Sequence, residues 1–70
     1  MERVVIHPLV WAGSEYFVPV LYRRIRDGVA WEPVGIALGL PYSTRAQAER
    51  RAERGWPGIP VEHAHGEGLL

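Results

Sequence analysis

The sequence predicts an α+β fold: a three-stranded antiparallel meander with one helix packed on the sheet and a short C-terminal fourth strand, in the order β-β-β-α-β. Three observations predict it. Alternating and apolar residues flank Asp27-Gly28 over residues 16–39, and this dipeptide is the strongest short-range signal of a β-hairpin. A stretch rich in β-branched residues precedes the hairpin. A helix signal follows it, over residues 45–54.

The chain length predicts one small domain, which we expect over residues 1–63, with residues 64–70 as a flexible C-terminal tail. A chain of 70 residues buries only about 60% of the surface that its unfolded form exposes, so its core is marginal by itself. The absence of cysteine excludes disulfides and thiolate zinc sites as additional support. Three Trp, three Tyr and 47% hydrophobic residues are a large apolar supply for so small a domain. We therefore expect self-association, as a homodimer or a higher oligomer.

The first residues resemble an export signal only in part. Residues 4–10 are apolar and follow Arg3, but Pro8 interrupts the run and the basic region is a single Arg beside Glu2. No segment approaches the ~20 apolar residues of a membrane span. We therefore expect a cytoplasmic protein with no membrane partner. All eight basic residues are Arg, and Lys and Asn are absent, a thermophile-like bias that is compatible with a hot habitat or with a GC-rich genome.

The first strand is predicted over residues 3–10, which are rich in β-branched side chains, with Trp11 at or just past its end. Pro8 is typical of an edge strand or a bulge, because it has no N–H to donate. A short turn, Ala12-Gly13-Ser14-Glu15, leads into the long second strand. The meander continues through the Asp27-Gly28 hairpin and ends at Leu40-Pro41.

A two-residue type I′ loop at Asp27-Gly28 would set the register of the second and third strands. The facing pairs are then Arg26 with Val29, Arg24 with Trp31, Arg23 with Glu32, Tyr22 with Pro33, and Leu21 with Val34. One face is mostly apolar and is assigned to the core: Phe17, Pro19, Leu21, Arg23 and Ile25, opposite Leu38, Ile36, Val34, Glu32 and Ala30. Gly35 and Gly39 are typical of a bulge or of close backbone approach.

The other face of the hairpin mixes aliphatic, aromatic and guanidinium groups, and we expect it to be the binding or interface face. Its members are Val18, Val20, Tyr22, Arg24, Arg26 and Trp31. Such a face can pack against a second subunit, where Arg24 opposite Trp31 forms a cross-strand cation–π pair.

The helix is predicted over residues 45–54, since Thr44 with Gln47 fits a capping box and Gly55 ends the run. Ala48 and Ala52 form a small inward stripe that lets the helix lie close to the sheet. The stripe has an aromatic residue at either end, Tyr42 and Trp56. After the helix, residues 59–63 are predicted to form the short fourth strand.

Candidate chemistry is sparse, and we expect no catalytic residue, no metal and no cofactor, so the protein is not predicted to be an enzyme. His63 and His65 fall on one face of a strand, but two ligands do not make a metal site. Ser43 and Thr44 are explained by helix capping, and no base is placed near Ser14. Glu49 and Glu53 alternate with Arg45, Arg50 and Arg54, a pattern typical of a charged solvent face.

Two functions fit the predicted face. A sheet that displays Tyr22, Arg24, Arg26 and Trp31 together can stack on bases and contact phosphates. In addition, the order of strand, Asp-Gly turn, strand, Tyr42-Ser43-Thr44 and an Ala-rich helix resembles the small sheet-plus-helix modules at the start of many phage-type integrases. That resemblance covers residues 16–54 and implies a sheet laid in a DNA groove.

The formal net charge of zero weighs against nucleic acid, because affinity for a polyanion grows with the number of phosphates neutralised. The first prediction is therefore a small non-catalytic protein-interaction or regulatory module acting as a homo-oligomer. Its partner is itself, with another protein as a further option, and nucleic-acid binding is the alternative.

Overall fold

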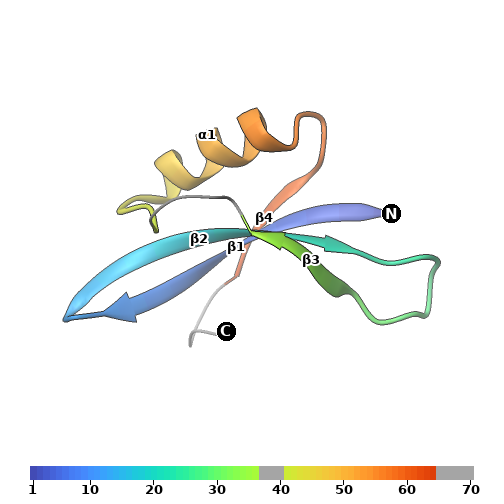
Figure 1. Ribbon diagram of the computed structural model, residues 1–70, viewed down its shortest axis with the longest axis horizontal. Coiled ribbons are helices and arrows are strands. Elements are labelled where there is room, and N and C mark those ends of the chain that lie inside the picture. Colours follow the sequence, from blue (N-terminus) through green and yellow to red (C-terminus); the bar gives the residue numbers. More distant parts are fainter. Residues whose placement is uncertain (37–40, 65–70) are drawn as a thin grey trace.

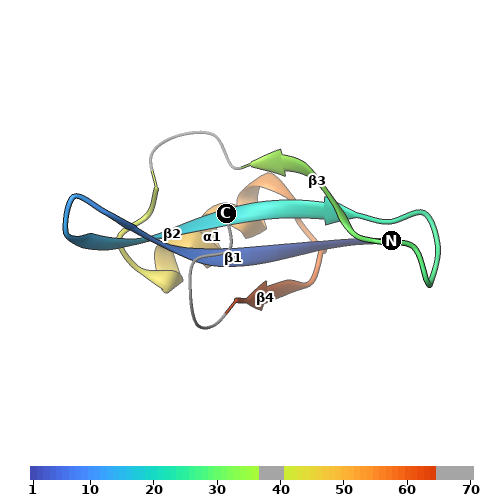
Figure 2. The same ribbon diagram turned by 90° about the horizontal axis from the view of Figure 1, so that it is seen from below.

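The computed structural model describes residues 1–36 and 41–64 of the chain. Four strands form one sheet in the order β3-β2-β1-β4, and one helix packs on one face of it (Figures 1 and 2). The elements are β1 (Glu2–Trp11), β2 (Ser14–Arg23), β3 (Glu32–Ile36), α1 (Arg45–Gly55) and β4 (Val61–His63). The first three strands are antiparallel, whereas β4 runs parallel to β1. The predicted α+β fold is confirmed.

Two further predictions concern the residues that follow β4 and the residues that follow β3. Pairing beyond β4 continues to Ala64, whose N–H donates to the Ile6 carbonyl over 2.9 Å. The rest of the predicted tail, residues 65–70, lies outside the described residues, as do Leu38, the predicted partner of Phe17, and Gly39. Within residues 1–36 and 41–64, no helix has the length and apolar character needed to cross a membrane.

The hairpin of β1 and β2 is closed by a two-residue turn at Ala12-Gly13. Both residues have positive φ, 52° and 79°, as a type I′ turn requires. Pairing therefore runs without interruption from Trp11 opposite Ser14 to Glu2 opposite Arg23. Trp11 belongs to the strand. Because Ala12 carries a Cβ in the left-handed region, where L-residues are strained, this turn stores strain.

Replacing Ala12 with Asn is expected to stabilise the protein by about 0.5–1 kcal/mol, because Asn tolerates the left-handed conformation and Asn-Gly favours type I′ turns. Urea unfolding of both chains measures the change. Ala46→Asn is the matched control, since Ala46 is an exposed residue inside α1. There the same substitution should lower stability by about half a kcal/mol through helix propensity. A loss of stability in both variants would contradict the strain at Ala12.

The Asp27-Gly28 hairpin forms, but the predicted two-residue type I′ loop is wrong. β2 ends at Arg23 and β3 begins at Glu32, so this dipeptide lies within a loop over residues 24–31. A turn closes at its tip, where the Val29 N–H donates to the Arg26 carbonyl over 3.3 Å. Only Gly28 has positive φ, at 84°. A turn with positive φ at only one of its two central residues does not match the twist of paired strands. The two segments that flank the turn therefore separate and are not paired within the loop.

The predicted register holds next to this loop and then shifts by one residue. Arg23 pairs with Glu32 and Tyr22 with Pro33, as predicted. A bulge follows, and Leu21 pairs with Gly35 instead of Val34, while Val20 takes Ile36 as its partner. The predicted core pairs Leu21–Val34 and Pro19–Ile36 are therefore wrong.

The bulge has a packing reason and a consequence for Ile36. Gly35 now lies on the face toward α1, where an added Cβ would be 3.5 Å from the Trp56 ring, so this ring packs directly on the glycine backbone. Ile36 is carried to the opposite face and is 60% exposed. Ile25, predicted for the core, is 84% exposed because the loop has already left the sheet.

The core lies between the sheet and α1. One cluster joins Val4 and Leu21 to Ala52, and the other joins Ile6 and Phe17 to Ala48. Partly buried side chains close the two clusters: Tyr42, Trp56, Ile59 and Val61. The predicted inward alanine stripe is confirmed, and both alanines are fully buried. Their small size lets the helix approach the sheet closely.

The helix begins as the capping signal predicts. The Thr44 side chain accepts a hydrogen bond from the Gln47 N–H over 3.1 Å. The helix ends at Gly55, and the Trp56 N–H then bonds the Ala52 carbonyl.

Candidate functional site

The sheet face that points away from α1 is the first candidate, and we call it the open face. No described helix or strand covers it, and Figure 2 is viewed from that side. Strand alternation and register assign its members. They are Arg3, Val5, His7, Leu9 and Trp11 of β1, Tyr16, Val18, Val20 and Tyr22 of β2, and Ile36 of β3.

The residues predicted for the binding face are placed differently from one another. Val18, Val20 and Tyr22 lie on the open face, but Val20 is only 1% exposed. Arg24 and Trp31 are half-buried at the two ends of the loop, directly after β2 and directly before β3. Arg26 is exposed inside the loop. Of the six residues, Val20 is therefore the one that is removed from solvent within the monomer.

Trp31 is held by guanidinium groups of its own chain. Arg3 lies over its ring at 4.4 Å from the centroid and Arg24 at 4.5 Å. Each arginine is also ion-paired, with Glu62 over 3.1 Å and with Asp27 over 3.0 Å, respectively. The predicted Arg24–Trp31 pair thus forms. A base that stacked on Trp31 would have to displace these contacts, which are typically worth about 0.5–1 kcal/mol each at an exposed site.

His7 lies in the middle of the open face and was missed by the sequence analysis. Its Nε2 is 2.8 Å from the Tyr22 hydroxyl, and the residue is 4% exposed. Its Nδ1 is buried and has no hydrogen-bond partner among the described residues. Burial lowers the pKa of His7 below its ordinary value of 6.5. A second proton on Nδ1 would add a charge and a donor without an acceptor, so the neutral ring is favoured.

The stability of the protein should therefore fall as the pH falls through about 6.5, because the unfolded chain takes up a proton that folded His7 resists. Above that pH both states hold neutral His7, and its contribution is constant. Urea unfolding over a pH series, for the wild type and for His7→Gln, measures the effect. The difference between the two curves isolates His7 from the other titrating groups. Parallel curves would contradict the burial of a neutral ring.

The closed end of the β1–β2 hairpin, residues 10–16, which we call the arm, carries two exposed apolar side chains. Val10 is 72% exposed and Trp11 is 68% exposed. The Trp11 ring packs against Tyr16 with centroids 6.3 Å apart. In Figure 1 the arm extends beyond α1. A two-residue turn at Ala12-Gly13 would have revealed this arm from the sequence, because it places Trp11 and Tyr16 on one face.

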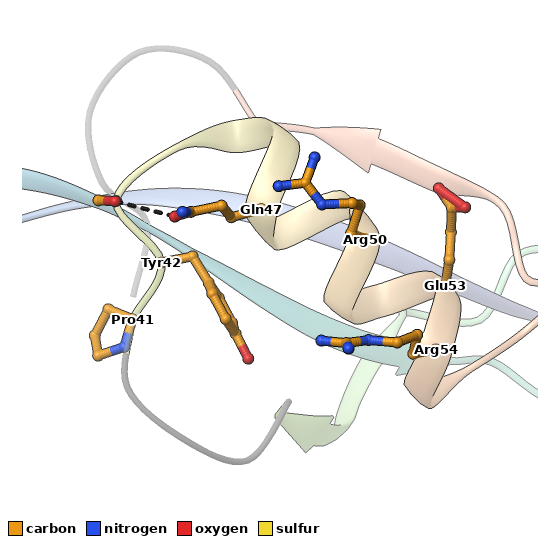
Figure 3. A pocket seen from close by; sticks show the side chains of 7 residues that line it. Pro41, Tyr42, Gln47, Arg50, Glu53 and Arg54 are labelled. Atoms are coloured by element: carbon orange, nitrogen blue, oxygen red, sulfur yellow. Dashed lines mark hydrogen bonds between the residues drawn. The ribbon is translucent and has the colours of Figure 1, made fainter.

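A cleft beside α1 is the second candidate. It has a volume of about 560 Å³ and lies between the helix and the segment that precedes it. Figure 3 shows its lining, formed by Pro41, Tyr42, Ser43, Gln47, Arg50, Glu53 and Arg54. The sequence pattern explains most of these side chains by helix capping, by the core and by a solvated helix face. No sequence motif marks the cleft, because it forms only when the chain before α1 packs on β2.

His63 has a structural role, because its ring is hydrogen-bonded to two side chains of α1. Its Nδ1 accepts from Arg45 over 3.0 Å, and its Nε2 donates to Glu49 over 2.5 Å. These contacts tie β4 to α1, so Arg45 and Glu49 do not belong to the purely solvated face that was predicted. Both ring nitrogens are engaged. Among residues 1–36 and 41–64, no group of three or more side chains is arranged to hold a metal ion, and His65 lies outside them.

The hydroxyl groups considered as nucleophiles have local roles or none. Thr44 caps α1, and the Ser43 hydroxyl donates to the Gln47 side chain over 3.0 Å. Ser14 is exposed at the start of β2.

No family model matches this chain, and comparisons with curated proteins and with solved structures also found no match.

Proposed function

We propose that this protein is a non-catalytic interaction module that associates with a second copy of itself through the open face and the arm. The observation that carries the proposal is the 68% exposure of Trp11 on the open face of the arm, where its ring packs beside Tyr16. Val10, its neighbour in the strand, is exposed on the opposite face of the arm. Exposed apolar side chains that gather on one element are typical of an interaction site. The interface proposed from the sequence is thereby extended from β2 to β1. We place the module in the cytoplasm, on the grounds given for its first residues.

The small core supports self-association in particular. Its two clusters contain six buried side chains of the described part: Val4, Ile6, Phe17, Leu21, Ala48 and Ala52. Two of these are alanine, so the apolar area removed from water by the monomer is modest. A chain of this length commonly gains the missing stability by oligomerisation. A second copy is always present at the concentration of the chain itself.

The shape of the open face favours a two-fold pair. In a symmetric dimer the same patch serves both subunits, so a projecting arm on one copy needs a complementary surface on the other. The open face offers such a surface next to the arm, with the apolar side chains Val5, Leu9 and Val18 partly accessible. Trp and Tyr are enriched at the centres of such interfaces. We expect Trp11 to carry much of the association energy.

Trp11→Ser is expected to convert the oligomer to a monomer, because a buried Trp commonly contributes 2 kcal/mol or more to an interface, which is roughly a 30-fold loss of affinity. Analytical ultracentrifugation over a concentration series measures this. Ile25→Ser is the matched control, since Ile25 is equally apolar and 84% exposed but lies in the loop over residues 24–31. It should leave the oligomer unchanged. A wild-type monomer at all concentrations, or equal dissociation of both variants, would overturn the proposal.

The nucleic-acid alternative stays a prediction with a separate test. Its main stacking residue, Trp31, is occupied by Arg3 and Arg24. The proposed module should therefore show no affinity for random single-stranded oligonucleotides at low salt. Binding that falls steeply between low and moderate ionic strength, and that Trp31→Ala abolishes, would favour the alternative.

A further inference from the structure

Two arginines of α1 face the cleft without ion pairs. Arg50 and Arg54 are four residues apart on the helix, so they lie on the same side of it. Neither forms a salt bridge with any residue of the described ranges. In Figure 3 the Arg54 side chain extends from α1 toward Tyr42, whereas the Arg50 guanidinium and the Glu53 carboxylate, which also line the cleft, point away from Tyr42. The cleft therefore combines free guanidinium groups with an aromatic wall.

The opposite wall of the cleft is fixed in place. Tyr42 exchanges two backbone hydrogen bonds with Phe17, of 2.7 and 3.0 Å. The Tyr42 side chain also packs against the cluster of Ile6, Phe17 and Ala48. At the N-terminal end of α1, the Ser43 hydroxyl donates a hydrogen bond to the Gln47 side chain. A wall anchored in this way is preorganised, which lowers the entropic cost of binding a ligand.

We propose that this cleft binds a small organic anion, with its carboxylate or phosphate on Arg54, near the positive charge of Arg50, and its apolar body against Tyr42 and Pro41. The volume of about 560 Å³ is of the size that small-molecule sites have. Guanidinium groups bind both oxyanions through paired N–H donors, so the shared chemistry is an oxyanion on an apolar ring or chain. The cleft lies on the α1 side of the sheet, away from the open face, so the inference does not rest on the proposed self-association.

Titration of the full chain, followed by ¹H–¹⁵N NMR, tests the inference. Benzoate and phenyl phosphate are the probes for the two oxyanions, inorganic phosphate tests the need for an apolar body, and benzylamine carries the same ring with opposite charge. We expect at least one aromatic anion to shift the amide resonances of residues 42–54 in a saturable manner. Arg54→Gln should weaken that binding about tenfold, since one charge-assisted contact is lost. Arg26→Gln, at an exposed arginine outside the cleft, is the control and should not.

Each other outcome counts against the site. Absence of saturable shifts at a probe concentration of about 10 mM would overturn the proposed site, because a probe with a Kd of about 1 mM would be mostly bound there. Equal binding of benzylamine would show that the arginines do not select charge. Equal binding of inorganic phosphate would remove the apolar body from the inference, and an unchanged affinity in Arg54→Gln would remove the arginine. Because oligomeric state is measured separately, failure here leaves the proposed dimer intact.

Discussion

Replacing Leu21 with Asp is expected to unfold the protein. Leu21 is 7% exposed and packs with Val4 and Ala52 in the cluster that Trp56 closes. A carboxylate there would be removed from water, and no described cation belongs to that cluster. Burying an unpaired charge costs several kcal/mol, while a chain of this length has roughly 4–10 kcal/mol of stability in total. The substitution therefore removes most or all of the stability.

Far-UV circular dichroism and the dispersion of amide resonances measure this outcome. Arg24→Ala is the companion variant, because Arg24 lies beyond the end of β2 and contacts Trp31, Asp27 and Met1 at the surface. It should keep the fold and lose no more than about 1 kcal/mol, since its contacts are solvent-screened. Equal damage from the two substitutions would mean that the inward and outward sides of β2 have been assigned the wrong way round.

Ile6→Ala is expected to have the second largest effect, a loss of about 2–5 kcal/mol of folding free energy. Ile6 is fully buried between β1 and α1, against Phe17 and Ala48. Both neighbours are held in place, Phe17 by its bonds to Tyr42 and Ala48 by the helix backbone, so the cavity would close only in part. Urea unfolding measures the loss, and a constant m-value would show that stability alone has changed.

Ile25→Ala removes the same atoms from an isoleucine that is 84% exposed, so it should change stability by less than about 0.5 kcal/mol. The comparison has a second use. If the folded chain is a dimer, the apparent stability of each variant rises with protein concentration. A loss in Ile6→Ala that matched the loss in Ile25→Ala would contradict the core described above.

Residues that lie close together in the chain are enough to predict the helix cap, the inward alanines and the alternation of β2. The Thr44 cap bonds a backbone N–H three residues away, and Ala48 and Ala52 are one helical turn apart. Their roles follow from helix geometry alone. The alternation of β2 also holds over its length, because a side chain on a strand cannot change face without a bulge. These local rules were sufficient for the order of elements and for the inward side of β2.

The remaining features arise from contacts between segments that are distant in the chain. The bulge beside Leu21 follows from the packing of Trp56 on Gly35, and it moves Ile36 to the open face. The loop over residues 24–31 follows from strand twist, which a single positive φ at Gly28 does not match. The parallel position of β4, the burial of His7 and the cleft beside Tyr42 likewise need partners far along the chain. Such contacts have no spacing that a sequence pattern can reveal, because their register is set by packing.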